Sequence, residues 1–316
     1  MSDQRCAIFV DAGFLLGAGG TLVSGTSLRP ATSVDFAPLI ATIAELATSD
    51  CHLEPLRIYW YDASHEAIFT DQHKQIALLP DVKVRLGRIG VNGGQKGVDL
   101  RLGLDLVGVA RTGAAGTAYV LTGDDDLAEA IDAAQDLGMR VKLIGIEDNS
   151  NRLGVTSVAE HLALQVDGML TLPASLITET FHQSRSSGPT PATVGPGAVT
   201  STNRPDPTLL AKAAQRSPAS PSSHSDAPAT AHRVETTPDL LAAAGEVGRI
   251  VAEKVFETTT EASLEEIKSD EPVLPRHIDV VLLKDCASRM GETHTNLQSV
   301  RRTLRSAFWE RLNQMH

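Results

Sequence analysis

Short apolar runs alternate with longer segments of helical periodicity over residues 5–182, and this alternation limits the fold more than any other feature. Five runs have the length and residue types of strands, namely residues 6–10, 56–60, 82–86, 118–122 and 140–146. Helices are expected at residues 35–48, 63–79, 98–112 and 125–138, and near 155–165. Strands that alternate with helices form a parallel sheet covered on both faces, so the pattern predicts a doubly wound α/β domain.

The composition changes abruptly after about residue 182. Residues 183–237 contain eight of the 16 prolines and almost no bulky apolar side chain beyond Leu209 and Leu210. Such a segment cannot bury enough apolar surface to offset the entropy lost on ordering, which predicts a disordered linker rich in Pro, Ser, Ala and Thr. We therefore expect an α/β domain at residues 1–182, the linker at 183–237 and a second folded part at 238–316.

The second folded part is expected to be a small helical module. Apolar residues recur every three or four positions in segments 238–257, 274–290 and 296–314. The last segment is also basic, with Arg301, Arg302, Arg305 and Arg311. A basic helix can recruit RNA or a protein partner, whereas a solvated helix face is the simpler interpretation. The sequence leaves both open, together with the question of whether the chain forms a homo-oligomer.

The overall charge and the cysteine pattern restrict the class of protein. A net charge of -11 argues against bulk attraction to nucleic acid or anionic membrane, so any contact with RNA is expected to be local. No apolar run approaches the roughly 20 residues that span a bilayer. The widely spaced Cys6, Cys51 and Cys286 form neither a disulfide framework nor a zinc motif. We expect a cytoplasmic protein with no membrane partner.

Three separate segments carry an aspartate to the same predicted edge of the sheet. Asp11 ends the first strand, Asp124 follows the run at 118–122, and Asp99 stands in the first turn of the helix that precedes that run. In a doubly wound sheet, ligands bind beyond the carboxyl ends of the strands, where the strand order reverses. We therefore expect these carboxylates to lie around one crevice.

Carboxylates held close together raise one another's pKa unless a cation compensates their charge. Mg²⁺ or Mn²⁺ is the natural compensation, because these hard ions prefer oxygen ligands. Such a metal can activate water and stabilise charge on a phosphate oxygen, as phosphodiester hydrolysis requires. Helix capping is the alternative for the triplet Asp124 to Asp126, since Asp126 and Glu129 have the spacing of a capping box. Asp11 is harder to explain in this way, because a charge directly after "AIFV" is costly without a partner.

These residues lie in ordered motifs that resemble the NYN domain of the PIN-like nuclease superfamily. The motifs are "AIFVDAGFL", "RIYWYDA", "QKGVDLRLGLDLV", "YVLTGDDDLAEAIDAAQDLGMRVKLIGI" and "SVAEHLALQVDGMLTL", which together cover about residues 5–170. The resemblance implies a three-layer α/β fold that binds Mg²⁺ or Mn²⁺ and cuts RNA. It also implies an acidic site for catalysis and metal binding made of Asp11, Asp99, Asp124 and Asp126. Asp125 stands where the family commonly has serine.

The first motif departs from the family pattern at one position. The family often continues D-x-x-N after the strand, whereas this chain has Phe14, which can neither bind metal nor hydrogen-bond a phosphate through its side chain. Two functions therefore stay open: a metal-dependent ribonuclease, and a non-catalytic RNA-binding or regulatory module that keeps the pocket without turnover.

Several polar residues are candidates for substrate contact. Lys96, three residues before Asp99, is expected to bind phosphate, and Thr122 takes the small hydroxyl position before Gly123. Arg85, Arg88 and Arg101 are more typical of solvated surface, and the aromatic run Tyr59, Trp60 and Tyr61 is more typical of core than of base stacking. The chain lacks the glycine-rich nucleotide-binding motifs, and a receiver domain would need a second aspartate at the first strand.

Overall fold

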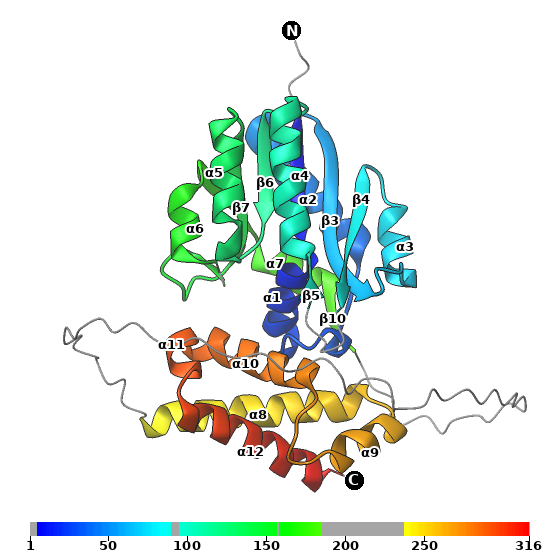
Figure 1. Ribbon diagram of the computed structural model, residues 1–316, viewed down its shortest axis with the longest axis vertical. Coiled ribbons are helices and arrows are strands. Elements are labelled where there is room, and N and C mark those ends of the chain that lie inside the picture. The colour runs from blue at the N-terminus through cyan, green and yellow to red at the C-terminus, as the bar shows by residue number, and fades with distance from the viewer. Residues whose placement is uncertain (1–4, 90–94, 157, 185–236, 316) are drawn as a thin grey trace, which may run out of the picture. The chain divides into compact units, whose positions relative to one another are not determined.

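The computed structural model describes residues 5–89, 95–156, 158–184 and 237–315 (Figure 1). The predicted linker at residues 183–237 lies almost wholly outside these ranges, so the proposed domain division stays a prediction. The α/β elements and the C-terminal helices belong to one compact unit. Within the described ranges, no helix combines the length and apolar character needed to cross a membrane.

A mostly parallel sheet forms the centre of the α/β part. Its parallel strands are β1 (Cys6–Asp11), β3 (Pro55–His65), β4 (Val82–Ile89), β6 (Thr117–Leu121), β7 (Arg140–Glu147) and β9 (Gly168–Leu172). The short strands β5 (Gln95–Lys96) and β8 (Val155–Thr156) pair antiparallel to β4 and β7. β1 pairs with β3 on one side and with β6 on the other. The strand order therefore reverses beside β1, and the predicted fold class is confirmed.

Helices cover both faces of this sheet. α4 (Val98–Thr112) and α5 (Ala128–Asp136) lie on the near face in Figure 1, and α2 (Phe36–Cys51) lies behind it. The buried residues of α2 recur at helical spacing and are Phe36, Leu39, Ile40, Ile43 and Ala47. This apolar stripe faces the sheet, as an amphipathic helix requires. The result is a three-layer arrangement with the strands in the middle.

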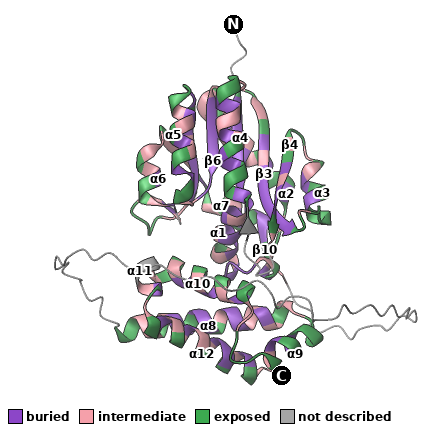
Figure 2. Cartoon of the chain, viewed as in Figure 1, coloured by how far each residue is buried: buried purple, intermediate pink, exposed green. Residues whose placement is uncertain are grey.

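The strands beside the reversal point are the most buried part of the protein. Every residue of β1 and β6 is buried, and β6 accordingly appears purple in Figure 2. A strand enclosed on both faces is expected to be a continuous apolar run, as both sequences are. The polar exceptions are Thr117 at the start of β6 and Asp11 at the end of β1, which carries a carboxylate. The core thus fixes the position at which that carboxylate leaves the sheet.

Two helices of the α/β part were not predicted from sequence, α1 (Ala12–Ser24) and the short α7 (Ala174–Thr180). α1 follows β1 directly, although its sequence "AGFLLGAGGTLVS" is rich in glycine, which disfavours helices by about 1 kcal/mol each. The glycines allow close packing instead. A Cβ added at Gly19 would lie 2.6 Å from the ring of Phe181, in the strand β10 (Phe181–Gln183) that pairs with β2 (Thr32–Val34). Tertiary contact has therefore overridden local propensity.

Two predicted helices are shorter than expected. Residues 63–65 continue β3 and pair with β4, so only α3 (Asp71–Ala77) remains of the helix predicted at 63–79. The helix begins after Thr70, where a capping box with His73 satisfies the free amide groups. In the segment 155–165, β8 occupies the start and α6 (Glu160–Gln165) occupies only the end. The short helices η1 (Arg29–Ala31) and η2 (Asp125–Leu127) complete this part.

The C-terminal residues form helices with a second apolar core. They are α8 (Pro238–Thr258), α9 (Glu261–Ser269), α10 (Arg276–Met290), α11 (Glu292–Thr295) and α12 (Gln298–Gln314). α8 and α12 pack against each other over most of their length. Phe308 and Trp309 of α12 are buried in this core, to which Leu28 and Ala31 from the α/β part also contribute. The predicted helical module is therefore confirmed.

Much of the basic face of α12 is engaged within the module. Arg305 forms two hydrogen bonds with Asp279, at 2.7 and 2.9 Å, and Arg311 pairs with Glu253 at 2.6 Å. Arg301 donates to the side chain of Asn296 at 2.6 Å. These contacts favour a structural role for the three arginines. Recruitment of RNA or a protein partner by the module stays a prediction.

Gly248 is expected to be essential for the packing of α8 against α12. A Cβ at this position would overlap the backbone oxygen of Leu304 and lie 3.0 Å from the amide nitrogen of Phe308, and backbone atoms cannot move aside cheaply. Gly248→Ala should lower the free energy of unfolding by about 1–3 kcal/mol, measured by urea denaturation. Gly108→Ala in α4 is the matched control, because nothing lies within 4 Å of its added Cβ. The control should be neutral or stabilising by up to about 1 kcal/mol, and equal losses in both variants would contradict this packing argument.

Candidate functional site

Asp11 stands where β1 passes into α1, at the carboxyl edge of the sheet. Its side chain is only 8% exposed. One carboxylate oxygen accepts from the amide of Phe14 at 3.2 Å and caps α1, and the other accepts from the Thr122 hydroxyl at 3.4 Å. The side chain of Phe14 is itself buried in the core. The position where the family often has asparagine thus supplies a backbone donor and an apolar ring.

Burial makes the negative charge of Asp11 costly. Desolvation raises the pKa of Asp11 to about 6, with a further upward contribution from the charge of Asp99. The hydrogen bond from Phe14 and the charge of Lys284 act in the opposite direction without cancelling the shift. An incoming cation would relieve this cost, because opposite charge favours the ionised carboxylate.

Thr122 connects Asp11 to the acidic triplet. The hydroxyl is fully buried, donates to Asp11 and accepts from the amide of Asp124 at 3.2 Å. Asp124 then caps η2 by accepting from the amide of Asp126 at 3.1 Å. The enclosed hydroxyl thus connects the two acidic segments, and the contact of Thr122 with substrate stays a prediction.

Asp99 links the segments electrostatically. It lies in the first turn of α4, whose N-terminus is at the same edge as the ends of β1 and β6. Partial burial raises the pKa of Asp99, and the charges of Asp124 and Asp126 raise it further. The charge of Asp99 in turn raises the pKa of Asp11. The charges of the four predicted acidic residues are therefore linked to one another through Asp99.

The carboxylates share this edge without forming a closed ligand shell. Among the residues that the structure describes, no three His, Cys, Asp or Glu side chains lie close enough together to hold a metal ion. Asp125 does not contribute to this group of carboxylates, because its own carboxylate faces His161 at 3.1 Å. The backbone of Lys96 belongs to β5, but its side chain lies outside the described residues. The metal-binding and substrate roles therefore stay predictions.

Most of the other arginines and aromatic residues considered for contact with RNA are engaged within the protein. Trp60 and Tyr61 are fully buried, which agrees with a role in the core. Tyr61 donates to Asp105 at 3.0 Å, and Arg85 lies 3.2 Å from the same carboxylate. Arg101 donates to the backbone oxygen of Leu86. Tyr61 and the two arginines thus support the sheet and α4.

A buried charge cluster at the end of β3 was not predicted. Asp62 is 1% exposed and pairs with Arg29 at 2.8 Å and with His73 at 3.1 Å. Burial by itself raises the pKa of Asp62, but the hydrogen bond from His73 and the charge of Arg29 outweigh it and lower the pKa. A charge after a buried strand was the signal that singled out Asp11, and the same signal in "RIYWYDA" would have found Asp62. Because its partners satisfy it, the cluster is structural.

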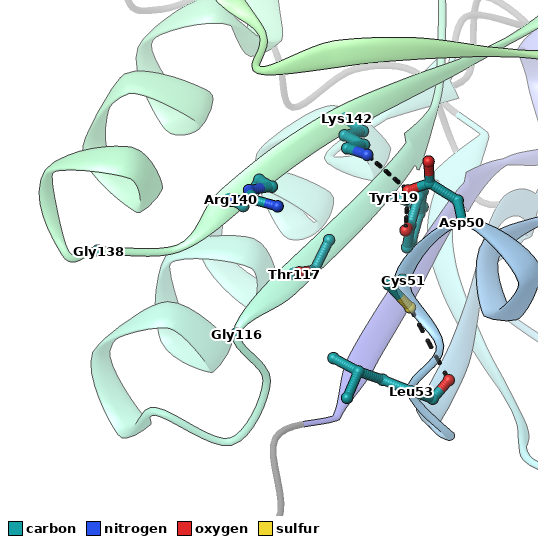
Figure 3. Close-up of a pocket in the computed structure, with 9 residues that line it drawn as sticks. All are labelled: Asp50, Cys51, Leu53, Gly116, Thr117, Tyr119, Gly138, Arg140 and Lys142. Carbon is teal, nitrogen blue, oxygen red and sulfur yellow. Dashed lines mark hydrogen bonds and ion pairs between the residues drawn. The ribbon is translucent and has the colours of Figure 1, made fainter.

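A cavity of about 400 Å³ lies at the opposite edge of the sheet, near the starts of β6 and β7 (Figure 3). Asp50 accepts there from Lys142 at 2.6 Å and from the hydroxyl of Tyr119 at 2.5 Å. Arg140 and Cys51 also line the cavity. Its amino-end location separates it from the aspartates at the carboxyl edge, so it is not part of the candidate site.

A known protein family matches the part of the chain that carries this site. The NYN domain family matches residues 5–164, which include the four acidic positions. This chain belongs to the NYN family. The match confirms the resemblance seen in the sequence motifs and makes the chain a member of the PIN-like nuclease superfamily.

Two individual proteins resemble parts of this chain, and neither has a described function. An uncharacterised protein of Sinorhizobium fredii is 35% identical over 108 residues, which cover 34% of this chain and 50% of the relative. The chain thus spans half the length of that curated relative. A crystal structure of a protein of unknown function from Vibrio parahaemolyticus covers 54% of this chain and 95% of its own, at 11% identity and a TM-score of 0.37. The assignment to the family rests on the NYN match.

Replacing Asp11 should stabilise the metal-free NYN protein at neutral pH. Because the pKa of Asp11 is raised from 3.8 to about 6 in the folded state, its favourable contribution is complete below pH 4 and is lost as the pH rises through 6. Asn caps helices as well as Asp but does not ionise. Asp11→Asn should therefore raise the free energy of unfolding at pH 7.5 by roughly 2 kcal/mol.

The measurement is urea denaturation in EDTA at pH 4.5 and pH 7.5, with the exposed Asp125→Asn as control. The gain from Asp11→Asn should shrink at pH 4.5, and the control should show little gain at either pH. Millimolar Mn²⁺ should narrow the gap at pH 7.5 if it binds only the folded wild-type protein. An equal effect of Asp11→Asn at both pH values would contradict a charged, desolvated Asp11.

Proposed function

We propose that this NYN protein is a metal-dependent ribonuclease that hydrolyses phosphodiester bonds of RNA. The observation that supports it most is the position of Asp99, whose charge acts on Asp11 while the charges of Asp124 and Asp126 act on Asp99. Three segments from different parts of the chain thus bring negative charge to the edge where β1 and β6 lie side by side. Membership of the PIN-like superfamily supports the same chemistry.

The donor set suits a hard divalent ion. Carboxylate oxygens are the ligands that Mg²⁺ and Mn²⁺ prefer, and Asp11, Asp99 and Asp124 would hold such an ion. Asp99 and Asp124 both keep part of their surface open to solvent, so their side chains have room to turn towards Asp11. A bound ion would supply an activated water and charge stabilisation at the phosphate. Asp126, exposed beside Asp124, would complete the shell or orient the water.

The remaining residues would prepare this site. The amide of Phe14 and the hydroxyl of Thr122 hold the two oxygens of Asp11, which limits its rotation. Thr122 also fixes the start of the turn that carries Asp124. Fixed ligands reduce the ordering that binding requires.

A non-catalytic RNA-binding or regulatory module is the second candidate function. The observation that favours it is Phe14, whose buried ring leaves no polar side chain where the family often has asparagine. Such a module would keep the acidic edge and bind RNA without turnover.

The ribonuclease proposal predicts that the aspartates differ sharply in their effect on RNA cleavage. Asp11→Asn and Asp124→Asn should each lower Mn²⁺-dependent cleavage of labelled single-stranded RNA by roughly 100-fold or more, because each removes a charged ligand. Asp125→Asn is the matched control, since its carboxylate faces His161. It should keep cleavage within about threefold of wild type.

All three variants should retain the circular dichroism spectrum of the wild-type chain. Unchanged cleavage by Asp11→Asn and Asp124→Asn would remove the proposed mechanism. RNA binding by the wild-type protein without metal-dependent fragments would favour the second candidate function.

A further inference from the structure

Two consecutive residues of α10 bring charge to the segment that follows Asp11. Asp285 is 3% exposed and accepts from the Thr26 hydroxyl at 2.6 Å and from the amide of Ser27 at 2.9 Å. Thr26 and Ser27 follow the C-cap residue of α1, Gly25. The carboxylate thus anchors α10 to the first connection of the α/β part through two buried hydrogen bonds, and bonds to a charged acceptor are among the stronger ones.

Apolar packing supports the same contact. Leu28 and Ala31, which follow the anchored residues, are buried in the core formed by the C-terminal helices. A shared core and a buried polar anchor together give α10 a defined place beside α1. Lys284, adjacent to the anchor, is therefore held in a defined place as well.

The Lys284 side chain lies along the first turns of α1. Its ammonium donates to the backbone oxygen of Gly13 at 3.3 Å. A Cβ at Gly17 would lie 2.6 Å from the ammonium nitrogen, so the absence of a side chain there leaves room for it. Gly13 is two residues beyond Asp11. The lysine thus brings a positive charge to the acidic edge from a distant part of the sequence.

Several charged groups surround Lys284, and two of them are engaged by other partners. Packing lowers the pKa of Lys284, Asp11 and Asp285 act to raise it, and Arg29 acts to lower it. Asp285 is already engaged by Thr26 and Ser27, and Arg29 by Asp62. An ammonium has three N–H donors, and Lys284 uses one on Gly13. The Lys284 residue as a whole is exposed to solvent.

We propose that Lys284 of the C-terminal module is a substrate-binding residue of the nuclease site, where its ammonium binds the RNA phosphate next to Asp11. This rests on the function proposed above. A chain with a net charge of -11 and an acidic edge repels RNA, so a cation at that edge is needed for a phosphate to approach. A lysine ammonium is a compact charge suited to phosphate. The C-terminal module would then complete the active site.

The test compares Lys284→Met with Lys254→Met in the full-length chain. Lys254 belongs to the same module and pairs with Glu257 on its surface, so its loss removes the same charge elsewhere. The affinity for a fluorescein-labelled single-stranded RNA is measured in EDTA, which prevents cleavage, over a range of salt concentrations. Lys284→Met should weaken binding about tenfold and reduce the salt slope by about 0.7, the value for one phosphate contact on a single strand. Lys254→Met should change neither.

Lys284→Arg keeps the charge and should retain binding within about threefold. This variant and the melting temperatures of all variants together show whether a loss of RNA binding in Lys284→Met reflects the missing charge or impaired folding. With Mn²⁺, Lys284→Met should raise KM for RNA more than it lowers kcat.

Two results would overturn the proposal. Equal RNA affinities and salt slopes for Lys284→Met and Lys254→Met would show that the ammonium does not bind phosphate. Unchanged RNA affinity with tighter Mn²⁺ binding in Lys284→Met, measured by calorimetry, would show that Lys284 is instead a counter-ion that competes with the metal. In both cases, cleavage of RNA by the wild-type chain would still support the ribonuclease proposal. If the wild-type chain instead binds RNA through Lys284 but does not cleave it, the ribonuclease proposal is wrong and the role of Lys284 in binding stands.

Discussion

The exit of Asp11 from a fully buried strand is the constraint on which the candidate site depends. Its carboxylate is nearly enclosed, so its negative charge is unfavourable without compensation. The amide of Phe14 and the hydroxyl of Thr122 satisfy its oxygens but carry no full charge. Positive charge must come from elsewhere, from Lys284 of the C-terminal helices or from a bound metal. Fold stability and the proposed metal binding therefore oppose each other at this residue.

The glycines of α1 show how close packing and the placement of charge are connected in this protein. They weaken the intrinsic helix propensity of the segment, which is why its sequence did not predict a helix. They also let other groups approach the helix closely, namely the ring of Phe181 at Gly19 and the ammonium of Lys284 at Gly17. Contacts made by distant residues thus both stabilise the helix and bring charge to the end of β1.

Much of the fold could be predicted because its signals are local. Apolar runs and helical periodicity located the main strands and the helices α2 and α4, and the parallel order followed from their alternation. The aspartates were located by the same reasoning, since residues after parallel strands meet at one edge. The pairings of Asp62 with Arg29 and of Tyr61 with Asp105 could not be predicted, because they join residues 33 and 44 positions apart.

The sequence by itself determined the fold class, the family and the segments that carry Asp11, Asp99 and Asp124 to one edge, because periodicity and motif order are properties of the chain. Only the tertiary structure decided which charges oppose or support one another there. Asp285 anchors to residues 258 and 259 positions away, and this contact places Lys284 beside the start of α1. No local pattern encodes such a contact, since it depends on how two apolar cores pack together.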